Sequence, residues 1–457
     1  MCGFLFCSFD ISDADITKSD FTVRRRGPDG KNIVRANGCT YVHYLLHITG
    51  EMTEQPIVSA TGEEFLLYNG EIYNYKSLGD FKSDGQSILA AYQARAGASS
   101  SSASWINDLD GEFGGIIHAP SQDRLVIFRD AFGTKPVYMA MDSRGIAISS
   151  YLSQLSGLGF KQFLKVPING TTDIDLNAKS GAVTPYRVFD VRQHKDSYDD
   201  WCDAFYEAVR KRTDNDRIKY FIGLSSGYDS GLIAAVLNES GTQYNSYSIK
   251  AAEDVGVMKS RAKLVAHNEF MHLTQSEYDS QQAFLIANCE PYDSPPRATR
   301  HNGYSLLKDK GAVGTGIICE KATSAGCRVY ISGQGSDEII SDYGHNGLPA
   351  PGFLHATIAG KFPPDLSTVF PWENFFSGTQ EEFLAKDEHV GGTYGIETRY
   401  PFLDFSVVQE FLWLSPDLKN RCYKAPIDHM LTKLNFPMAR AGLMSKVGFR
   451  ANSGFKR

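Results

Sequence analysis

The spacing of hydrophobic positions changes near residue 190. Before it, short apolar or β-branched runs alternate with Gly, Pro, Asn and Asp, which predicts strands at 40–48, 64–68, 114–118, 124–129 and 137–140. One helix is expected over 84–96, where Ile88, Leu89 and Tyr92 recur at helical spacing. The polar stretch 97–104 (GASSSSAS) predicts a surface loop within this first part.

After residue 190 the pattern alternates between helices and strands. A helix is expected over 198–210, a buried strand over 218–224 and a helix over 230–237, and the alternation recurs at 244–250, 257–266 and 328–332. Such alternation predicts a parallel sheet covered by helices. We therefore expect two domains that meet near residues 190–197.

Composition narrows the class of protein. The chain has 457 residues and a formal net charge of −7, from 46 basic and 53 acidic side chains, which argues against a general nucleic-acid binder. No apolar run approaches the roughly 18 residues that span a bilayer, and the N-terminus lacks the pattern of a secretory signal. The 8 cysteines show neither CxxC nor zinc spacing, which predicts reduced thiols in a cytoplasmic protein.

The segment 222–230 (IGLSSGYDS) is the most informative local feature. A buried strand ends in small residues whose backbone N–H groups can approach an anion, and a helix begins directly afterwards. The segment lacks the GxxxxGK[ST] pattern of a P-loop. A carboxylate among phosphate ligands requires a cation, so Asp229 implies Mg²⁺. The structural alternative is a tight turn in which Ser225 or Asp229 caps the helix.

A second segment, 329–338 (VYISGQGSDE), repeats this arrangement. Asp337 is a candidate partner of Asp229 at the same metal, because loops at the carboxyl ends of parallel strands line one crevice. The structural alternative is an N-cap made by Ser336 or Asp337.

At these residues the chain resembles a known family. SSGYDS (225–230) is similar to the SGGxDS pyrophosphate loop of N-type ATP pyrophosphatases, and SGQGSDE (332–338) to the SGxGSDE of asparagine synthetases. GIETRYPFLD (395–404) resembles the GVEARVPFLD of the same family. Without this resemblance, the stretch 398–404 reads as a structural turn.

The N-terminal part carries the companion motifs. Removal of Met1 leaves Cys2 with a free α-amine, and such a thiol carries its own base for amide hydrolysis through a thioester. RGPD (26–29), NGEIYN (69–74) and RDAFGTKPVY (129–138) resemble motifs of class II glutamine amidotransferases. The order of motifs is that of asparagine synthetase B-type proteins.

This resemblance implies the fold and the domains. We expect an α+β N-terminal Ntn-hydrolase sandwich over 2–190, followed by an α/β parallel-sheet ATP pyrophosphatase domain over 195–457. It also implies the cofactors ATP and Mg²⁺, the small-molecule partners glutamine, ATP and an acceptor carboxylate, no nucleic acid or membrane partner, and a homodimer.

Residue roles follow from the motifs by the same resemblance. In the first domain they are the nucleophile Cys2, the oxyanion donors Asn69 and Gly70, and the glutamine-binding acids Glu71 and Asp84. In the second they are ATP binding by Leu224, Ser225, Gly227, Asp229, Ser230, Ser332 and Gly333, metal binding by Asp229 and Asp337, acceptor binding by Arg297, and catalysis by Lys424.

The sequence departs from the family pattern at several positions. Leu45 replaces the arginine that clamps the glutamine α-carboxylate, with His47, Arg24 and Arg25 as nearby substitutes. Gln334 replaces a glutamate that could orient or deprotonate the attacking nitrogen, and an amide cannot act as a base. Smaller departures are Ser226 and Gly231 for Gly and Ser, and Asp428 for the arginine of the KxxLR pattern.

These observations predict an ATP-dependent, glutamine-hydrolysing ligase that adenylates aspartate and releases AMP and pyrophosphate. One alternative is a related ligase that acts on an antibiotic, sugar-acid or peptide carboxylate. Another is a protein whose inactive glutaminase domain serves as a scaffold. Leu45 favours both alternatives, whereas Cys2, Asn69, Gly70 and Asp84 oppose complete loss of glutaminase function.

Overall fold

The computed structural model describes residues 2–96, 104–178, 180–185, 187–250, 253–297, 300–351, 353 and 355–439. The chain forms two compact units, the first of residues 1–188 with 392–395 and the second of 189–391 with 396–457. Each unit has its own sheets and its own core.

The N-terminal unit contains two antiparallel six-stranded sheets. The first has the order β10 (Phe163–Lys165), β8 (Tyr138–Asp142), β9 (Gly145–Ser149), β1 (Gly3–Cys7), β3 (Cys39–Leu45), β2 (Gly30–Ala36). The second has the order β12 (Ser180–Pro185), β11 (Gly170–Asp175), β7 (Arg124–Arg129), β6 (Gly111–Ala119), β5 (Phe65–Ile72), β4 (Ile57–Val58).

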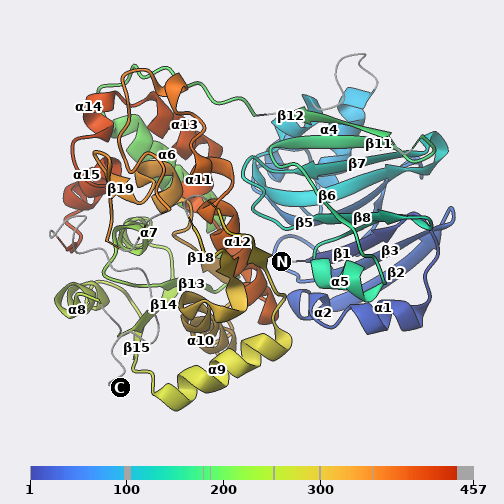
Figure 1. Ribbon diagram of the computed structural model, residues 1–457, viewed down its shortest axis with the longest axis horizontal. Coiled ribbons are helices and arrows are strands. Elements are labelled where there is room, and N and C mark those ends of the chain that lie inside the picture. The colour runs from blue at the N-terminus through green and yellow to red at the C-terminus, as the bar shows by residue number, and fades with distance from the viewer. Residues whose placement is uncertain are drawn as a thin grey trace. The chain divides into compact units, whose positions relative to one another are not determined.

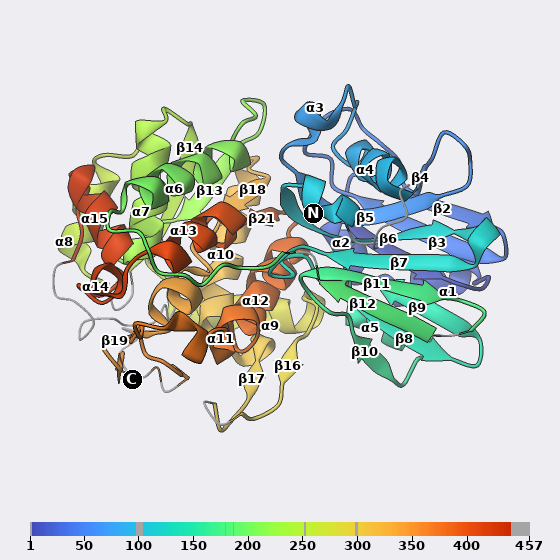
Figure 2. The same ribbon diagram turned by 90° about the horizontal axis from the view of Figure 1, so that it is seen from above.

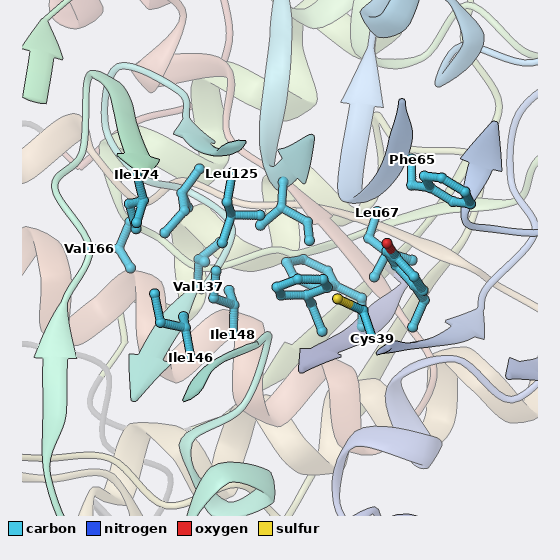
Figure 3. Packing of buried hydrophobic residues seen from close by; sticks show 14 residues of the cluster. Cys39, Phe65, Leu67, Leu125, Val137, Ile146, Ile148, Val166 and Ile174 are labelled. Atoms are coloured by element: carbon cyan, nitrogen blue, oxygen red, sulfur yellow. The ribbon is translucent and has the colours of Figure 1, made fainter. Parts of the chain in front are cut away.

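Alternation of side chains along these strands builds four layers. Cys39 and Ile148 of the first sheet meet Leu67 and Leu125 of the second in a buried core between the sheets (Figure 3). The opposite face of the second sheet packs on α4 (Gln86–Ala96). That of the first packs on α1 (Asp13–Ser19) and α5 (Leu152–Gly157) (Figure 1). Because successive residues of a strand point to opposite faces, each sheet supplies two apolar surfaces.

The C-terminal unit is built on a parallel five-stranded sheet. Its order is β15 (Asn268–Met271), β14 (Tyr244–Ile249), β13 (Tyr220–Gly223), β18 (Val329–Ile331), β21 (Glu397–Arg399). Helices α7 (Tyr228–Glu239) and α10 (Lys310–Ser324) lie on opposite sides of the sheet (Figures 1 and 2). The other long helices are α6 (Asp199–Arg212), α8 (Val255–Ala262), α9 (Gln275–Asn288), α12 (Thr379–Thr393), α13 (Phe405–Trp413) and α15 (Ala425–Lys433).

The strand order places two loops side by side. From β13 the chain first adds β14 and β15 on one side, and later returns to add β18 on the other side. Ligands of open parallel sheets bind where the order reverses in this way, outside the carboxyl ends of the strands. The segments after β13 and β18 are the two loops that the sequence singled out.

The predicted fold class is confirmed, with a two-sheet sandwich followed by a parallel sheet. The five strands predicted before residue 190 correspond to β3, β5, β6, β7 and β8, and the strand predicted over 218–224 corresponds to β13. The predicted helices correspond to α4, α6 and α7. The recurring segments 244–250, 257–266 and 328–332 fall on β14, α8 and β18. Residues 97–103 of the predicted surface loop lie outside the described residues. Among the residues that are described, no helix is both long and apolar enough to cross a membrane.

Candidate functional site

The thiol of Cys2 lies at the entrance to β1, next to the end of β3. Its Sγ is 3.7 Å from the carbonyl oxygen of Leu46. The Cys2 carbonyl accepts a hydrogen bond from Nε of Arg26 at 2.9 Å. Arg26, from the RGPD motif, is fully buried and also donates to the hydroxyl of Tyr151 at 3.2 Å. A buried guanidinium therefore fixes the backbone of the predicted nucleophile.

Asn69 is a buried amide that lies on β5, which packs against β1. Its side chain has no exposed surface. Among the residues that the structure describes, neither Oδ1 nor Nδ2 has a hydrogen-bond partner. An orphaned buried polar group typically costs about 1–3 kcal/mol, and a bound acceptor oxygen would relieve the share of this cost that belongs to the Nδ2 donor. We expect this arrangement of a side chain whose N–H group donates to an oxyanion.

Gly70 follows Asn69 and has to be a glycine. Its φ of +143° is disfavoured for residues with a side chain, and an added Cβ would lie 2.0 Å from the carbonyl oxygen of Glu112 on β6. A glycine here therefore lets the backbones of β5 and β6 lie close together.

The two predicted glutamine-binding acids meet at Tyr68. Asp84 lies just before α4 and accepts hydrogen bonds from the Tyr68 hydroxyl at 2.7 Å and the Ile72 N–H at 3.0 Å. Burial, with the charges of Asp84, Glu71 and Cys2, holds the pKa of Tyr68 well above its ordinary value. The three predicted residues therefore share one electrostatic environment.

Leu45 is the last residue of β3, one position before the carbonyl that the Cys2 thiol faces. Of the cations proposed to substitute for the missing arginine, His47 has its Nε2 3.0 Å from the carbonyl oxygen of Gly50. Arg24 and Arg25 lie over the ring of Phe21, at 5.4 and 5.6 Å. His47, Arg24 and Arg25 therefore each contact a neighbouring residue of the same domain.

In the C-terminal unit, two carboxylates meet on one buried ammonium. Lys424 Nζ lies 2.5 Å from Asp229 Oδ1, at the start of α7, and 2.8 Å from Asp337 Oδ1, after β18. Its side chain is only 1% exposed. The backbone of Lys424 has φ +52°, a left-handed conformation that is costly for a residue with a side chain and that persists at functional sites. Tyr423 adds a hydrogen bond to Asp337 at 3.1 Å.

Both capping alternatives are wrong. The N-cap of α7 is Gly227, without a side-chain cap, and the hydroxyl of Ser225 instead accepts from the Gly227 N–H at 3.0 Å and lies 2.8 Å from the hydroxyl of Ser230. Ser336 stands at the N-cap position before Asp337–Ser341, but its side chain makes no capping hydrogen bond, and its hydroxyl donates to Asp229 Oδ1 at 2.5 Å. The polar side chains of the two loops thus turn towards each other, with Gly333 close enough that a Cβ would lie 2.9 Å from that of Asp229.

The departure at Gln334 has a structural counterpart in Asp387. This buried acid on α12 accepts a hydrogen bond from Ser332 Oγ at 2.5 Å and interacts with the Gln334 side chain. Burial raises the pKa of Asp387 to about 6, against the opposing effects of Lys386, Ser332 and Gln334. A glutamate at position 334 would place a second carboxylate beside a buried one, so an amide suits this site.

Arg297 forms ion pairs with acidic residues other than Asp229 and Asp337. It donates to Glu382 on α12, which also accepts from Arg300 at 2.5 Å, and it lies 3.8 Å from Glu373. The structure therefore joins Lys424 to Asp229 and Asp337, and places Arg297 in a separate ion-pair cluster.

Several residues of the site were not predicted. Ser336 and Tyr423 adjoin predicted residues, so their neighbours were the available signal. Glu253, which accepts from the Ser226 N–H at 2.8 Å, and Asp387 come from segments without a motif. For Arg261 the available sequence signal is the unusual glycine at position 231, where a side chain would collide with it.

We expect the Asp387→Asn variant to be more stable than the wild type at pH 8 and equally stable at pH 4. The raised pKa means that the folded protein binds this proton more tightly than the unfolded chain. Its stabilising contribution is complete below the unfolded pKa near 4 and is lost as pH rises through about 6. The difference at pH 8 reaches up to about 3 kcal/mol. Calorimetry of the full chain at both pH values measures it.

The exposed Asp216→Asn variant is the control. A stability difference between wild type and Asp387→Asn that stays the same at pH 4 and pH 8 would contradict the assignment of a buried, protonating acid.

Comparison with known proteins shows which families the two parts of the chain are similar to. A glutamine amidotransferase domain family matches residues 1–166, and an asparagine synthase family matches residues 200–360. Asparagine synthetase [glutamine-hydrolyzing] 1 of Saccharomyces cerevisiae is 25% identical, covering 92% of this chain and 77% of its own. Asparagine synthetase B [glutamine-hydrolyzing] of Escherichia coli is 24% identical, covering 92% and 76%.

A solved structure of glutamine phosphoribosylpyrophosphate amidotransferase from B. subtilis aligns at a TM-score of 0.35 and 12% identity, covering 99% of this chain and 98% of that one. The two matched families occur in the order that the sequence motifs predict, with the amidotransferase domain first. The chain belongs to the asparagine synthetase family, in which a glutamine amidotransferase domain precedes an asparagine synthase domain.

Proposed function

We propose that the protein is a glutamine-dependent asparagine synthetase. Its glutaminase domain, 2–190, releases ammonia from glutamine, and its synthetase domain, 195–457, uses ATP to adenylate aspartate and form the amide, releasing AMP and pyrophosphate. The observation that carries the proposal is the meeting of Asp229 and Asp337, from two separate loops, on Lys424.

In the glutaminase domain, the proposed nucleophile is the thiolate of Cys2, with the α-amine of the mature N-terminus as its base. Nδ2 of Asn69 and the Gly70 N–H donate to the negative oxygen of the tetrahedral intermediate, which gives the orphaned Nδ2 group an acceptor. Glu71 and Asp84 hold the glutamine, and Asp84 takes its ammonium group.

In the synthetase domain, Leu224 and the small residues Ser225, Gly227 and Ser230 surround the phosphates at the N-terminus of α7, and Ser332 and Gly333 lie on the adenosine side. Arg297 contacts the acceptor. The pair Asp229 and Asp337 fits Mg²⁺, because two carboxylates from separate loops come together at Lys424, and Mg²⁺ commonly takes one or two carboxylates with phosphate oxygens. An ion held by these carboxylates would supply positive charge to the phosphates.

Lys424 provides a cation that does not depend on the metal. With formal charges of −2 on the carboxylates and +1 on the lysine, the three groups remain net negative, so a divalent cation is attracted to them. Lys424 then offers its charge to the α-phosphate and the reacting carboxylate. The partners are small molecules, and a cytoplasmic location and a homodimer belong to the same proposal.

Pyrophosphate release tests the proposal. With Mg·ATP and ammonium present, we expect AMP and pyrophosphate with aspartate, and lower rates with other carboxylates in a screen. Asp229→Asn and Asp337→Asn should each lower the rate at least about 100-fold, because each removes a metal ligand. Asp216→Asn, an exposed aspartate outside the site, should leave the rate unchanged.

Other products or acceptors in this assay would redirect the proposal. ADP and phosphate in place of AMP and pyrophosphate would contradict adenylation. A carboxylate that is turned over faster than aspartate would identify a different ligase of the same family.

Leu45→Arg tests the nitrogen source. Because Leu45 cannot pair with the glutamine α-carboxylate, we expect this variant to lower the KM for glutamine about 10- to 100-fold, with a smaller effect on kcat. Ammonium-dependent synthesis should not change. Cys2→Ala is the matched control and should lose only the glutamine-dependent rate.

A low-millimolar wild-type KM that Leu45→Arg does not improve would show that another cation already fills the role. Loss of ammonium-dependent synthesis in Cys2→Ala would contradict the separation of the two active sites.

A further inference from the structure

Arg261 is a buried cation beneath the loop that follows β13. It lies on α8, its side chain has no exposed surface, and no carboxylate of a described residue forms an ion pair with it. One of its terminal nitrogens, NH2, is buried and has no hydrogen-bond partner in the described part of the chain. Burial lowers the pKa of Arg261 to about 10, so the group is still charged at neutral pH.

The other nitrogens of Arg261 hold backbone carbonyls. NH1 donates to the carbonyls of Ser225 at 2.6 Å and Gly227 at 2.7 Å, and Nε donates to that of Pro437 at 2.8 Å. Pro437 follows α15, the helix that Lys424 begins. One guanidinium therefore ties the phosphate loop to the segment behind the catalytic lysine.

These bonds set the direction of the loop N–H groups. In a trans peptide the C=O and N–H point in opposite directions, so carbonyls turned to Arg261 direct the N–H groups of Ser226 and Tyr228 away from it. The N–H and hydroxyl of Ser226 both donate to one oxygen of Glu253. An anionic oxygen is thus already bound on this side of the loop.

Gly231 provides the space for this arrangement. A Cβ at Gly231 would lie 2.3 Å from NH2, 2.5 Å from Cζ and 2.8 Å from NH1 of Arg261. Glycine inside a helix costs about 0.5–1 kcal/mol relative to alanine, so its presence in α7 calls for a packing reason. A side chain here would displace the guanidinium and break its bonds to the loop.

We propose that Arg261 is a positioning residue that orients the pyrophosphate-binding loop and places a positive charge behind it, and that Gly231 is the space this residue requires. The inference rests on the proposed ATP site. It accounts for a departure at position 231, where asparagine synthetases usually carry serine.

A double-mutant cycle tests the pair, with ammonium as the nitrogen source. We expect Arg261→Met and Gly231→Ala each to lower kcat/KM for ATP about 10- to 100-fold, since each removes hydrogen bonds from a charged group. The inhibition constant of pyrophosphate should rise in parallel, while the KM for aspartate should not change. The double variant should resemble either single one, and Arg261→Lys should retain part of the activity because it keeps the charge.

Ser260→Ala, at the neighbouring exposed position of α8, is the matched control and should behave as wild type. A wild-type enzyme that releases no pyrophosphate would refute the proposed function itself. If the wild type releases pyrophosphate and Gly231→Ala has an unchanged kcat/KM for ATP, the role of Arg261 is overturned, whether or not Arg261→Met folds. It is also overturned if the losses of kcat/KM in the two single variants add up in the double variant.

Discussion

The synthetase unit is organised around the attraction of two carboxylates to one buried ammonium. Asp229 and Asp337 are 108 positions apart, yet each has an oxygen within 2.8 Å of Lys424 Nζ. Isolated, such charges would be costly to bury, so their mutual pairing is what allows them to lie together. Their positions follow from topology, because β13 and β18 are neighbours at the point where the strand order reverses.

The N-terminal unit contains a different constraint, a buried polar side chain for which the described residues provide no hydrogen-bond partner. This side chain is the amide of Asn69 on β5. Natural cores rarely keep such groups, because each lowers stability. Asn69 lies next to Gly70, on a strand that packs against β1, which Cys2 directly precedes, and the proposed oxyanion role would give a physical reason for keeping it.

The architecture and the two carboxylates Asp229 and Asp337 could be predicted from the sequence alone, but the residues that support them could not. In the parallel sheet, apolar runs predicted the central strands β14, β13 and β18, whereas β15 and β21, short strands at the two edges, carried too little pattern. Asp229 and Asp337 were found because each follows a strand and a turn of small residues. Arg261 and Asp387 act from helices without a motif, and their roles depend on side-chain directions that a single sequence does not contain.

The departures from the family pattern show the same limit. Gln334 seemed to remove a base, yet the structure pairs it with a buried acid on α12. Gly231 seemed a minor exchange, yet it leaves room for a guanidinium. For Leu45 the described part of the chain shows no such compensating group among the residues proposed to replace the missing arginine. These residues, His47, Arg24 and Arg25, contact Gly50 and Phe21.

Transfer of labelled nitrogen tests the central claim most directly. The protein is incubated with glutamine labelled with ¹⁵N in its amide, unlabelled aspartate and Mg·ATP, and the products are followed by nitrogen and phosphorus NMR. The account predicts ¹⁵N in the side-chain amide of asparagine, with one AMP and one pyrophosphate formed for each asparagine. Glutamate and labelled ammonia without asparagine, or labelled asparagine accompanied by ADP and phosphate, would contradict it.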